Sequence, residues 1–331
     1  MDVFWYALVG LLLTGYLVLE SIDFGVGMLI PLADTEAGRV RLRRTIVPLF
    51  LVNEVWLVAF GGLLFGALPL LEGELLHAQR TPVVVLLCAW FLRDAALWFR
   101  HASPGTAWRR AWDAVLPVTS LVLAAGWGIV LATLVRGLST GDNGRADATA
   151  GDIFHPFSLL CAALVVVAGL RQGALFAGRG LPEGDALRAR LDRTAKVLTP
   201  VLAGLLLVTA AVGAAVTDSP VTVGVVTAVA AVCVYASHLA RGAGRTVPAL
   251  LLGGVPLLAL PVMVGFAHGS TVLATRSGAG DLALSRAIAD DASLTLLSAT
   301  VLPTLVAVAL GQVWIWREFG RPAVRPAFTE A

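Results

Sequence analysis

Nine long apolar runs, separated by short polar segments, set the pattern of this chain. The runs cover residues 3–32, 45–71, 82–99, 115–135, 157–177, 197–217, 220–239, 247–268 and 293–316. Each is near or above the roughly 20 apolar residues that a helix needs to cross a bilayer. The pattern therefore predicts an all-α, polytopic membrane helix bundle with about nine transmembrane helices. We expect residues 1–331 to form a single integral membrane domain, because no linker is long enough to separate two soluble domains.

The sixth and seventh runs are separated by Asp218-Ser219-Pro220 alone. One helix over both runs would be roughly 65 Å long at about 1.5 Å per residue, about twice the thickness of the hydrocarbon layer. We therefore expect two spans with a tight turn between them.

Basic residues gather on one side of the predicted spans. Of the 24 Lys and Arg residues, 17 follow odd-numbered runs, including Arg317, Arg321 and Arg325 in the tail, and five follow even-numbered runs. Cytoplasmic loops of membrane proteins carry such an excess of Lys and Arg. The asymmetry predicts an extracytoplasmic N-terminus and a cytoplasmic C-terminus, as an odd number of spans requires.

Composition excludes several classes of protein. The chain is 58% hydrophobic and 14% charged, unlike a soluble domain, and its formal net charge of +2 gives no field that would recruit nucleic acid. Its three cysteines lie far apart in apolar runs, which predicts neither a disulfide framework nor a metal site. None of the five histidines falls in the middle of a run, so we expect this chain alone to bind no haem or other cofactor.

Six ionisable side chains lie inside the apolar runs: Glu20, Asp23, Glu54, Arg93, Asp94 and Arg171. Such groups are costly in a membrane and usually have a partner or a task. Helical rises place all six in the cytoplasmic half of their spans. Glu20 and Asp23 are three residues apart and share a helical face, with Arg93 and Arg171 as the available counter-ions.

Two interpretations of these charges stay open. In the first, Glu20, Asp23 and Glu54 are carriers in a proton-conducting cluster that opens to the cytoplasm. In the second, the charges are structural ion pairs between helices, with Arg93, Asp94 and Arg171 as charge partners.

Other polar and small residues have structural explanations. The steps Gly62-x-x-x-Gly66 and Gly169-x-x-x-Gly173 allow two helices to approach closely. Trp314 and Trp316, at the inner end of the last run, fit an aromatic belt at the membrane surface.

Two stretches near the start of the chain carry a more specific signal. Residues 15–29 read GYLVLESIDFGVGML and residues 53–58 read NEVWLV. These stretches closely resemble the opening of subunit II of the cytochrome bd quinol oxidases. Later stretches agree in order, at residues 99–101, 108–113, 155–161, 172–174 and 302–304. The resemblance therefore covers nearly the whole chain.

The resemblance implies a nine-span, non-haem subunit of a respiratory quinol:O2 oxidoreductase in the bacterial cytoplasmic membrane. Its partner would be a subunit I that carries haem b and haem d and oxidises quinol, so this chain would not be catalytic alone. Acidic residues of subunit II would help to supply cytoplasmic protons, which the reduction of O2 to water consumes. The resemblance leaves open whether a lipid or a quinone binds this chain and whether a small accessory subunit completes the complex.

The chain departs from the family pattern at the expected proton-uptake position. The family usually has His-Trp-Asp-Gly where residues 49–52 read LFLV, so Leu51 replaces the Asp commonly assigned to proton uptake. We expect that role to pass to Glu54, to Glu20 and Asp23, or mainly to the partner subunit. The other departures are Glu54 for the frequent Gln, Arg93-Asp94 for Arg-Pro, and His155 for Asn, at a position before Pro156 that suits a helix cap.

A secondary transporter is the alternative from a different class, with Glu20, Asp23 and Glu54 as ion-coupling sites. A purely structural membrane scaffold is a third. The resemblance favours the oxidase subunit.

Overall fold

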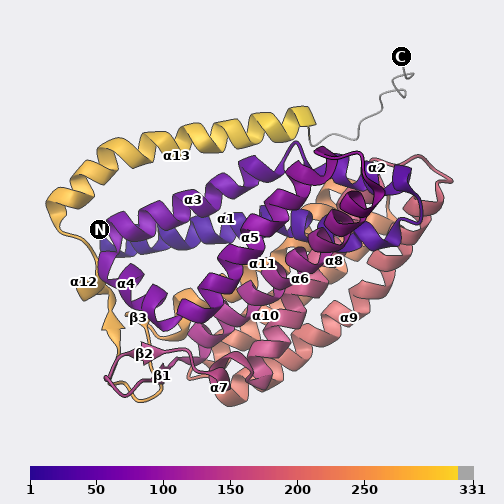
Figure 1. The fold of residues 1–331 in the computed structure, drawn as a ribbon. Helices are drawn as coiled ribbons and strands as arrows, with labels where there is room; N and C mark the ends of the chain where they lie inside the picture. The colour runs from indigo at the N-terminus through magenta and orange to yellow at the C-terminus, as the bar shows by residue number, and fades with distance from the viewer. Residues whose placement is uncertain (320–331) are drawn as a thin grey trace.

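The computed structural model describes residues 1–319, and these are predominantly helical (Figure 1). Nine helices in this part of the chain are long and apolar enough to cross a membrane. They are α1 (Asp2–Leu29), which continues into η1 (Ile30–Leu32), α3 (Phe50–Ala67), α5 (Arg80–Trp98), α6 (Thr106–Arg136), α8 (Pro156–Arg179), α9 (Ala186–Val216), α10 (Pro220–Gly242), α11 (Thr246–Ala267) and α13 (Asp291–Phe319). The predicted fold class is confirmed.

Shorter elements connect these spans at the two ends of the bundle. One end carries α2 (Glu36–Ile46) and η2 (Phe99–His101). The N-terminus lies at the other end (Figure 1). That end also carries α4 (Pro69–Ala78), α7 (Ala150–Ile153), α12 (Leu284–Ala287) and two small hairpins, which pair β1 (Ser139–Thr140) with β2 (Ala146–Asp147) and β3 (Thr271–Leu273) with β4 (Leu282–Ala283).

Proline sets several helix boundaries. The predicted second run, 45–71, is divided in the structure: its first residues end α2, Pro48 lies in the turn before α3, and Pro69 begins α4. Proline lacks the backbone N–H that continues a helix, but it suits the first helical position. Pro220 likewise begins α10, and α9 ends at Val216, so the predicted division between the sixth and seventh spans is confirmed.

Two spans begin well before their apolar runs. Helices α6 and α9 begin 9 and 11 residues before the predicted starts at residues 115 and 197. These extra turns are polar, and hydropathy marks only the part of a helix that lies in hydrocarbon. The Asp185 side chain caps α9, where it accepts hydrogen bonds from the backbone N–H groups of Leu187 at 2.8 Å and Arg188 at 3.3 Å.

Helix α1 is the axis of the bundle. It contacts α3, α6, α8 and α11, and three clusters of buried apolar side chains lie along its length. By contrast, α13 lies at the margin, along α3 (Figure 1). Residues 20–27 of α1, which include Glu20 and Asp23, are all buried.

Glycines bring α1 and α8 into backbone contact. A Cβ atom on Gly25 would lie 2.0 Å from the carbonyl oxygen of Gly169, and one on Gly173 would lie 2.4 Å from the carbonyl carbon of Gly25. The close approach predicted for Gly169-x-x-x-Gly173 is confirmed. The other step makes no such contact, since a Cβ on Gly62 would meet nothing within 4 Å and one on Gly66 would meet the Leu297 side chain.

A buried carboxylate ties together the loops at the N-terminal end of the bundle. Asp152 accepts hydrogen bonds from Arg136, the last residue of α6, and, at 2.6 Å, from Arg276, which lies between β3 and β4 in the loop after α11. Burial alone would raise the pKa of Asp152, but hydrogen bonds from Ser139, Arg276 and Thr149 outweigh that effect and lower its pKa to about 2. Asp152 therefore stays ionised at neutral pH and holds both arginines.

The α1–α8 contact can be tested with one added methyl group. We expect Gly173→Ala to destabilise the chain by about 1–3 kcal/mol, as overpacking of a close contact does. Gly62→Ala is the matched control, because its Cβ would lie in open space. Thermal unfolding in mild detergent measures both variants, and equal melting temperatures would contradict the contact.

Candidate functional site

Arg93 gathers three carboxyl groups in the interior of the bundle. Its Nη1 donates to Glu20 Oε1 on α1, and its Nη2 donates to Glu54 Oε1 on α3. Its Nε lies 3.1 Å from Oδ1 of Asp94, the next residue of α5. One planar guanidinium therefore joins three helices, a geometry that its fixed set of donors permits.

Asn53 brings a fourth carboxyl group into the same site. Its Nδ2 donates to Asp23 Oδ2 at 2.7 Å, one turn along α1 from Glu20. Trp90 completes the surroundings of Glu54, with its indole N–H donating to Oε1 at 2.8 Å. We refer to Arg93 with Glu20, Asp23, Glu54 and Asp94 as the carboxyl cluster.

The carboxyl cluster is buried and has more acids than cations. Glu20, Asp23 and Arg93 are 0% exposed, whereas the side chains of Glu54 and Asp94 are 7% and 23% exposed. Oε2 of Glu20 and Oδ1 of Asp23 have no hydrogen-bond partner among the described residues. Burying several carboxylates around one cation is costly. The surplus of carboxyl groups therefore provides sites that a proton can occupy.

The expectation that Arg171 is a counter-ion of this cluster is wrong. Arg171 is buried in α8, but its Nε donates to Thr199 Oγ1 at 3.0 Å and its Nη2 to Ser237 Oγ at 2.9 Å. None of the ion pairs in the described part of the chain includes Arg171. Its partners lie on α9 and α10, because position within a span does not determine which helices are neighbours.

The polar contacts that α13 makes could not be predicted from the apolar pattern of the chain. Gln312 Nε2 donates to Asn53 Oδ1 at 2.9 Å, and Trp56 Nε1 donates to Gln312 Oε1 at 3.1 Å. Trp316 was assigned to an aromatic belt, but its indole donates to Asn53 Oδ1 at 3.2 Å, whereas Trp314 is 65% exposed. The available signal was an amide, Gln312, inside an otherwise apolar run.

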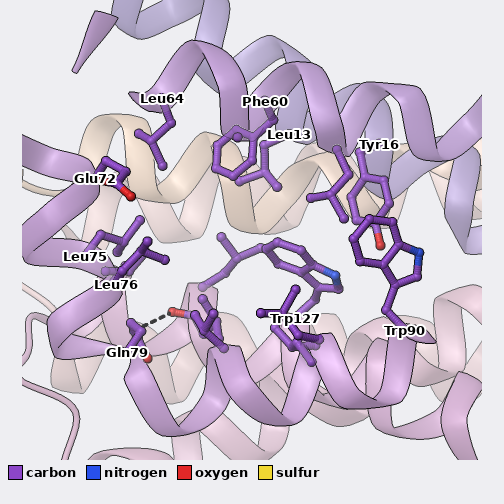
Figure 2. Close-up of a pocket in the computed structure, with 18 of the residues that line it drawn as sticks. Leu13, Tyr16, Phe60, Leu64, Glu72, Leu75, Leu76, Gln79, Trp90 and Trp127 are labelled. Atoms are coloured by element: carbon purple, nitrogen blue, oxygen red, sulfur yellow. Dashed lines mark hydrogen bonds between the residues drawn. The ribbon is translucent and has the colours of Figure 1, made fainter. Parts of the chain in front are cut away.

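An apolar cavity of about 310 Å³ lies between α1, α3, α4, α5 and α6 (Figure 2). Leucines such as Leu13 and Leu64 form most of its wall, together with the rings of Phe60 and Trp127. Trp90 belongs to both places, since it lines the cavity and donates to Glu54. Apolar side chains of the cavity wall therefore lie next to the cluster on the side of Trp90.

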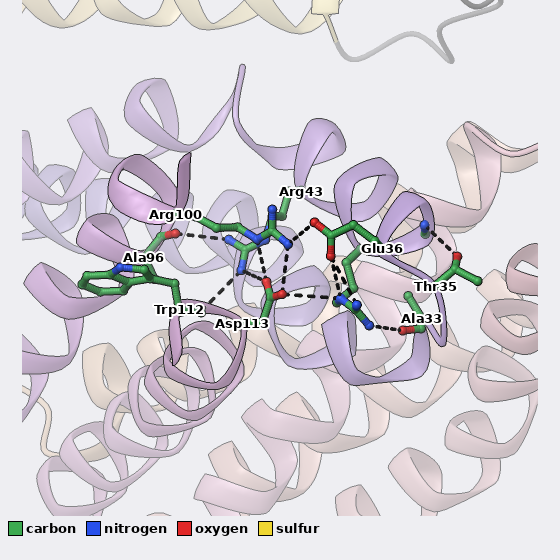
Figure 3. Close-up of polar contacts among 10 residues, drawn as sticks. Ala33, Thr35, Glu36, Arg43, Ala96, Arg100, Trp112 and Asp113 are labelled. Carbon is green, nitrogen blue, oxygen red and sulfur yellow. Dashed lines mark hydrogen bonds and ion pairs between the residues drawn. The ribbon is translucent and has the colours of Figure 1, made fainter. Parts of the chain in front are cut away.

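A second set of charges clamps the α2 end of the bundle (Figure 3). Asp113 of α6 accepts hydrogen bonds from Arg43 Nη2 at 2.6 Å and Arg100 Nε at 2.8 Å. Arg43 Nη1 also donates to the carbonyl oxygen of Ala96 at 3.2 Å, two residues after Asp94 on α5. The clamp therefore holds α2 and α6 next to the most exposed carboxyl group of the cluster.

The five histidines lie outside the middle of the spans. They lie in loops, in short elements or near helix ends, at His77, His101, His155, His238 and His268. The cap expected at His155 is confirmed, since its Nδ1 accepts the backbone N–H of Phe157 at 3.2 Å. Within residues 1–319, no group of three or more His, Cys, Asp or Glu side chains could hold a metal ion.

The fold and this site define a multi-pass membrane protein whose spans enclose one carboxyl-rich centre. Residues 1–319 match the family model of cytochrome bd terminal oxidase subunit II, so the chain belongs to that family, whose members are subunits of an oxidoreductase. The resemblance seen in the sequence is confirmed.

Individual relatives agree with this assignment. The chain is 29% identical to cytochrome bd ubiquinol oxidase subunit 2 of Bacillus subtilis (strain 168), over 95% of this chain and 94% of that protein. It is 30% identical to cytochrome bd-I ubiquinol oxidase subunit 2 of Escherichia coli (strain K12), over 52% of this chain and 47% of that protein. It shares its fold with a chain in the structure of bd oxidase from Geobacillus thermodenitrificans, at a TM-score of 0.76 and 20% identity, over 96% and 98% of the two chains.

Replacing Arg93 and replacing Arg171 should have different consequences. Arg93→Met leaves Glu20 and Glu54 buried without their partner, so we expect a loss of stability of about 3–5 kcal/mol and a poor yield of folded protein. Arg171→Met removes a cation whose described hydrogen bonds go to hydroxyl groups, so we expect a loss near 1 kcal/mol. Size-exclusion yield and thermal unfolding compare the two. Equal losses would contradict the assignment of Arg93 as the counter-ion.

Proposed function

We propose that this chain is the non-haem subunit II of a bd-type quinol:O2 oxidoreductase and that its carboxyl cluster supplies protons for the reduction of O2 to water. Membership of the subunit II family supports the first part. The observation that carries the second is one guanidinium in contact with three buried or partly buried carboxyl groups, with a fourth, Asp23, bound to Asn53 in the same site. A haem-bearing subunit I, with haem b and haem d, would be the partner and would supply the electron transfer from quinol to O2.

We place the α2 end of the bundle in the bacterial cytoplasm and the N-terminus outside, and treat the chain as one membrane domain. The excess of basic residues in loops after odd-numbered spans supports this orientation, although Arg321 and Arg325 lie outside the described residues. The carboxyl cluster then lies towards the cytoplasmic side, with Glu54 in the second turn of α3 and Arg93 in the last two turns of α5.

The exposure of the carboxyl groups orders a route through the cluster. Asp94 is the most exposed at 23%, Glu54 follows at 7%, and Glu20 is fully buried. Arg93 contacts all three, so a proton taken up at Asp94 has only short steps to Glu54 and Glu20 as the side chains shift around the guanidinium. Protons would therefore move inward from the α2 end to Glu20 and to Asp23, which is also fully buried and lies one turn along α1 from Glu20.

Glu54 takes the part of the carboxyl group that the family usually has at position 51. Leu51 is 53% exposed on the surface of α3, whereas Glu54, one turn further on, faces the interior and contacts Arg93. The Glu54 carboxyl group therefore lies on the route. The Leu51 side chain has no exchangeable proton and cannot take this role.

The cavity beside Trp90 suits the hydrocarbon part of a lipid or a quinone, because its wall is almost wholly apolar. Such an occupant would keep water away from that side of the cluster. Protons would then reach the cluster from the α2 end, where the Arg43–Asp113–Arg100 clamp holds the helices together.

The secondary-transporter alternative is not favoured, because the family match over residues 1–319 is to oxidase subunits. The scaffold alternative differs from our proposal in one respect: it requires no proton exchange at the carboxyl groups. Substitutions that keep shape and hydrogen bonding but remove the exchangeable proton therefore separate the two.

We expect Glu20→Gln, Asp23→Asn and Glu54→Gln each to slow quinol-driven O2 consumption, by up to about 100-fold for the group most directly on the route. The complex is purified through a tag on this chain from its native membranes in mild detergent. Subunit I and its haem should purify with it, and the haem spectrum should be the same in all variants.

Glu183→Gln is the matched control, because that side chain is 94% exposed. Unchanged turnover in all three cluster variants would support the scaffold alternative. A lone chain without haem that transports a solute in liposomes would support the transporter.

A further inference from the structure

Two indole rings fix the orientation of two buried amides between α13 and α3. Trp56 Nε1 donates to Gln312 Oε1 at 3.1 Å, and Trp316 Nε1 donates to Asn53 Oδ1 at 3.2 Å. Gln312 Nε2 donates to the same Asn53 oxygen at 2.9 Å. Asn53 is 0% exposed and Gln312 is 6% exposed, so water has little access to either amide.

The chemistry of these groups permits only this arrangement. An indole N–H can donate but cannot accept, so the oxygen of Gln312 has to face Trp56 and its NH2 group has to face Asn53. The oxygen of Asn53 then faces Gln312 and Trp316, and its NH2 group faces Asp23. Turning either amide over would set donor against donor in a buried site, which costs free energy.

The consequence is a difference between the two oxygens of Asp23. Its Oδ2 accepts the N–H of Asn53 at 2.7 Å and therefore has a donor, not an acceptor, opposite it. Its Oδ1 has no hydrogen-bond partner among the described residues and is the atom free to carry a proton. The charged and titratable groups around Asp23 are Glu20, Glu54, Arg93 and Asp94.

We propose that Gln312 and Trp316 are positioning residues for proton transfer: by orienting the Asn53 amide, they keep Oδ1 of Asp23 as the proton-exchanging atom. This proposal rests on the role of Asp23 in the proposed function.

The placement of Gln312 on α13 supports a role beyond docking. Of the described residues of α13, Leu294 and Gln312 are the buried ones. An apolar side chain at position 312 would pack α13 against α3 at least as well, because a buried polar group must first lose its hydration. The Gln312 amide is therefore better explained by its hydrogen bond to Asn53, which orients the Asn53 amide.

The test uses the intact purified complex with Gln312→Met and Trp316→Phe combined, which removes both donors to Asn53. Gln312→Met nearly keeps the side-chain volume, and Trp316→Phe keeps an aromatic ring. We expect turnover per haem to fall about three- to tenfold, the effect of one or two lost hydrogen bonds. The solvent isotope effect on turnover should rise, because proton transfer becomes more rate-limiting, and the haem spectrum should not change. Trp314→Phe, on the exposed side of the same helix, is the matched control and should behave as the wild type.

A double-mutant cycle with Asp23→Asn separates positioning from structural support. If Gln312 and Trp316 act through Asp23, their substitution should cause no further loss in the Asp23→Asn complex. If the losses caused by the α13 substitutions and by Asp23→Asn multiply, the proposal is wrong. It is also wrong if turnover falls only in proportion to haem content while the isotope effect keeps its wild-type value. Should the combined variant assemble poorly, Trp316→Phe alone is judged by the same criteria.

The same cycle tells two failures apart. If Asp23→Asn itself leaves turnover unchanged, the proposed function of Asp23 fails. If Asp23→Asn slows turnover while the substitutions on α13 do not, the positioning role alone fails.

Discussion

The fork of hydrogen bonds from Arg93 is the interaction on which the rest of the structure depends. It joins Glu20 of α1 and Glu54 of α3 to α5, in a part of the bundle from which water is excluded. Each of these groups would be costly to bury alone, and together they are tolerated because each provides the other with charge and hydrogen bonds. The Arg93 side chain therefore holds three spans together and provides the positive charge at the centre of the site.

The surrounding apolar structure makes this polar centre possible. The backbone contact of Gly25 with Gly169 and Gly173 holds α1 against α8, so that the carboxyl groups of α1 face α3 and α5 in a fixed position. The apolar cavity lies on one side of the cluster, and the clamp around Asp113 lies at the α2 end. The most accessible carboxyl group of the site therefore lies on the side of the charged α2 end, away from the apolar cavity.

Much of this arrangement could be predicted from sequence, because charges inside apolar runs stand out. Glu20, Asp23, Glu54 and Arg93 were all recognised in that way, and the structure brings them together. Neighbouring helices could not be predicted, so Arg171 was assigned to the wrong partners. The contact of Gln312 with Asn53 crosses 259 residues of chain and joins two uncharged amides, which apolar patterning does not mark as a pair.

The central claim is that protons for O2 reduction pass through the carboxyl cluster from the α2 side of the membrane. The most direct measurement is time-resolved proton uptake during a single turnover of the complex in oriented liposomes, with a pH-sensitive dye on one side at a time. Our account predicts uptake from the α2 side in step with O2 reduction, and loss of that phase when Glu20, Asp23 and Glu54 are all neutralised. Uptake from the N-terminal side, or unchanged uptake in the neutralised complex, would contradict it.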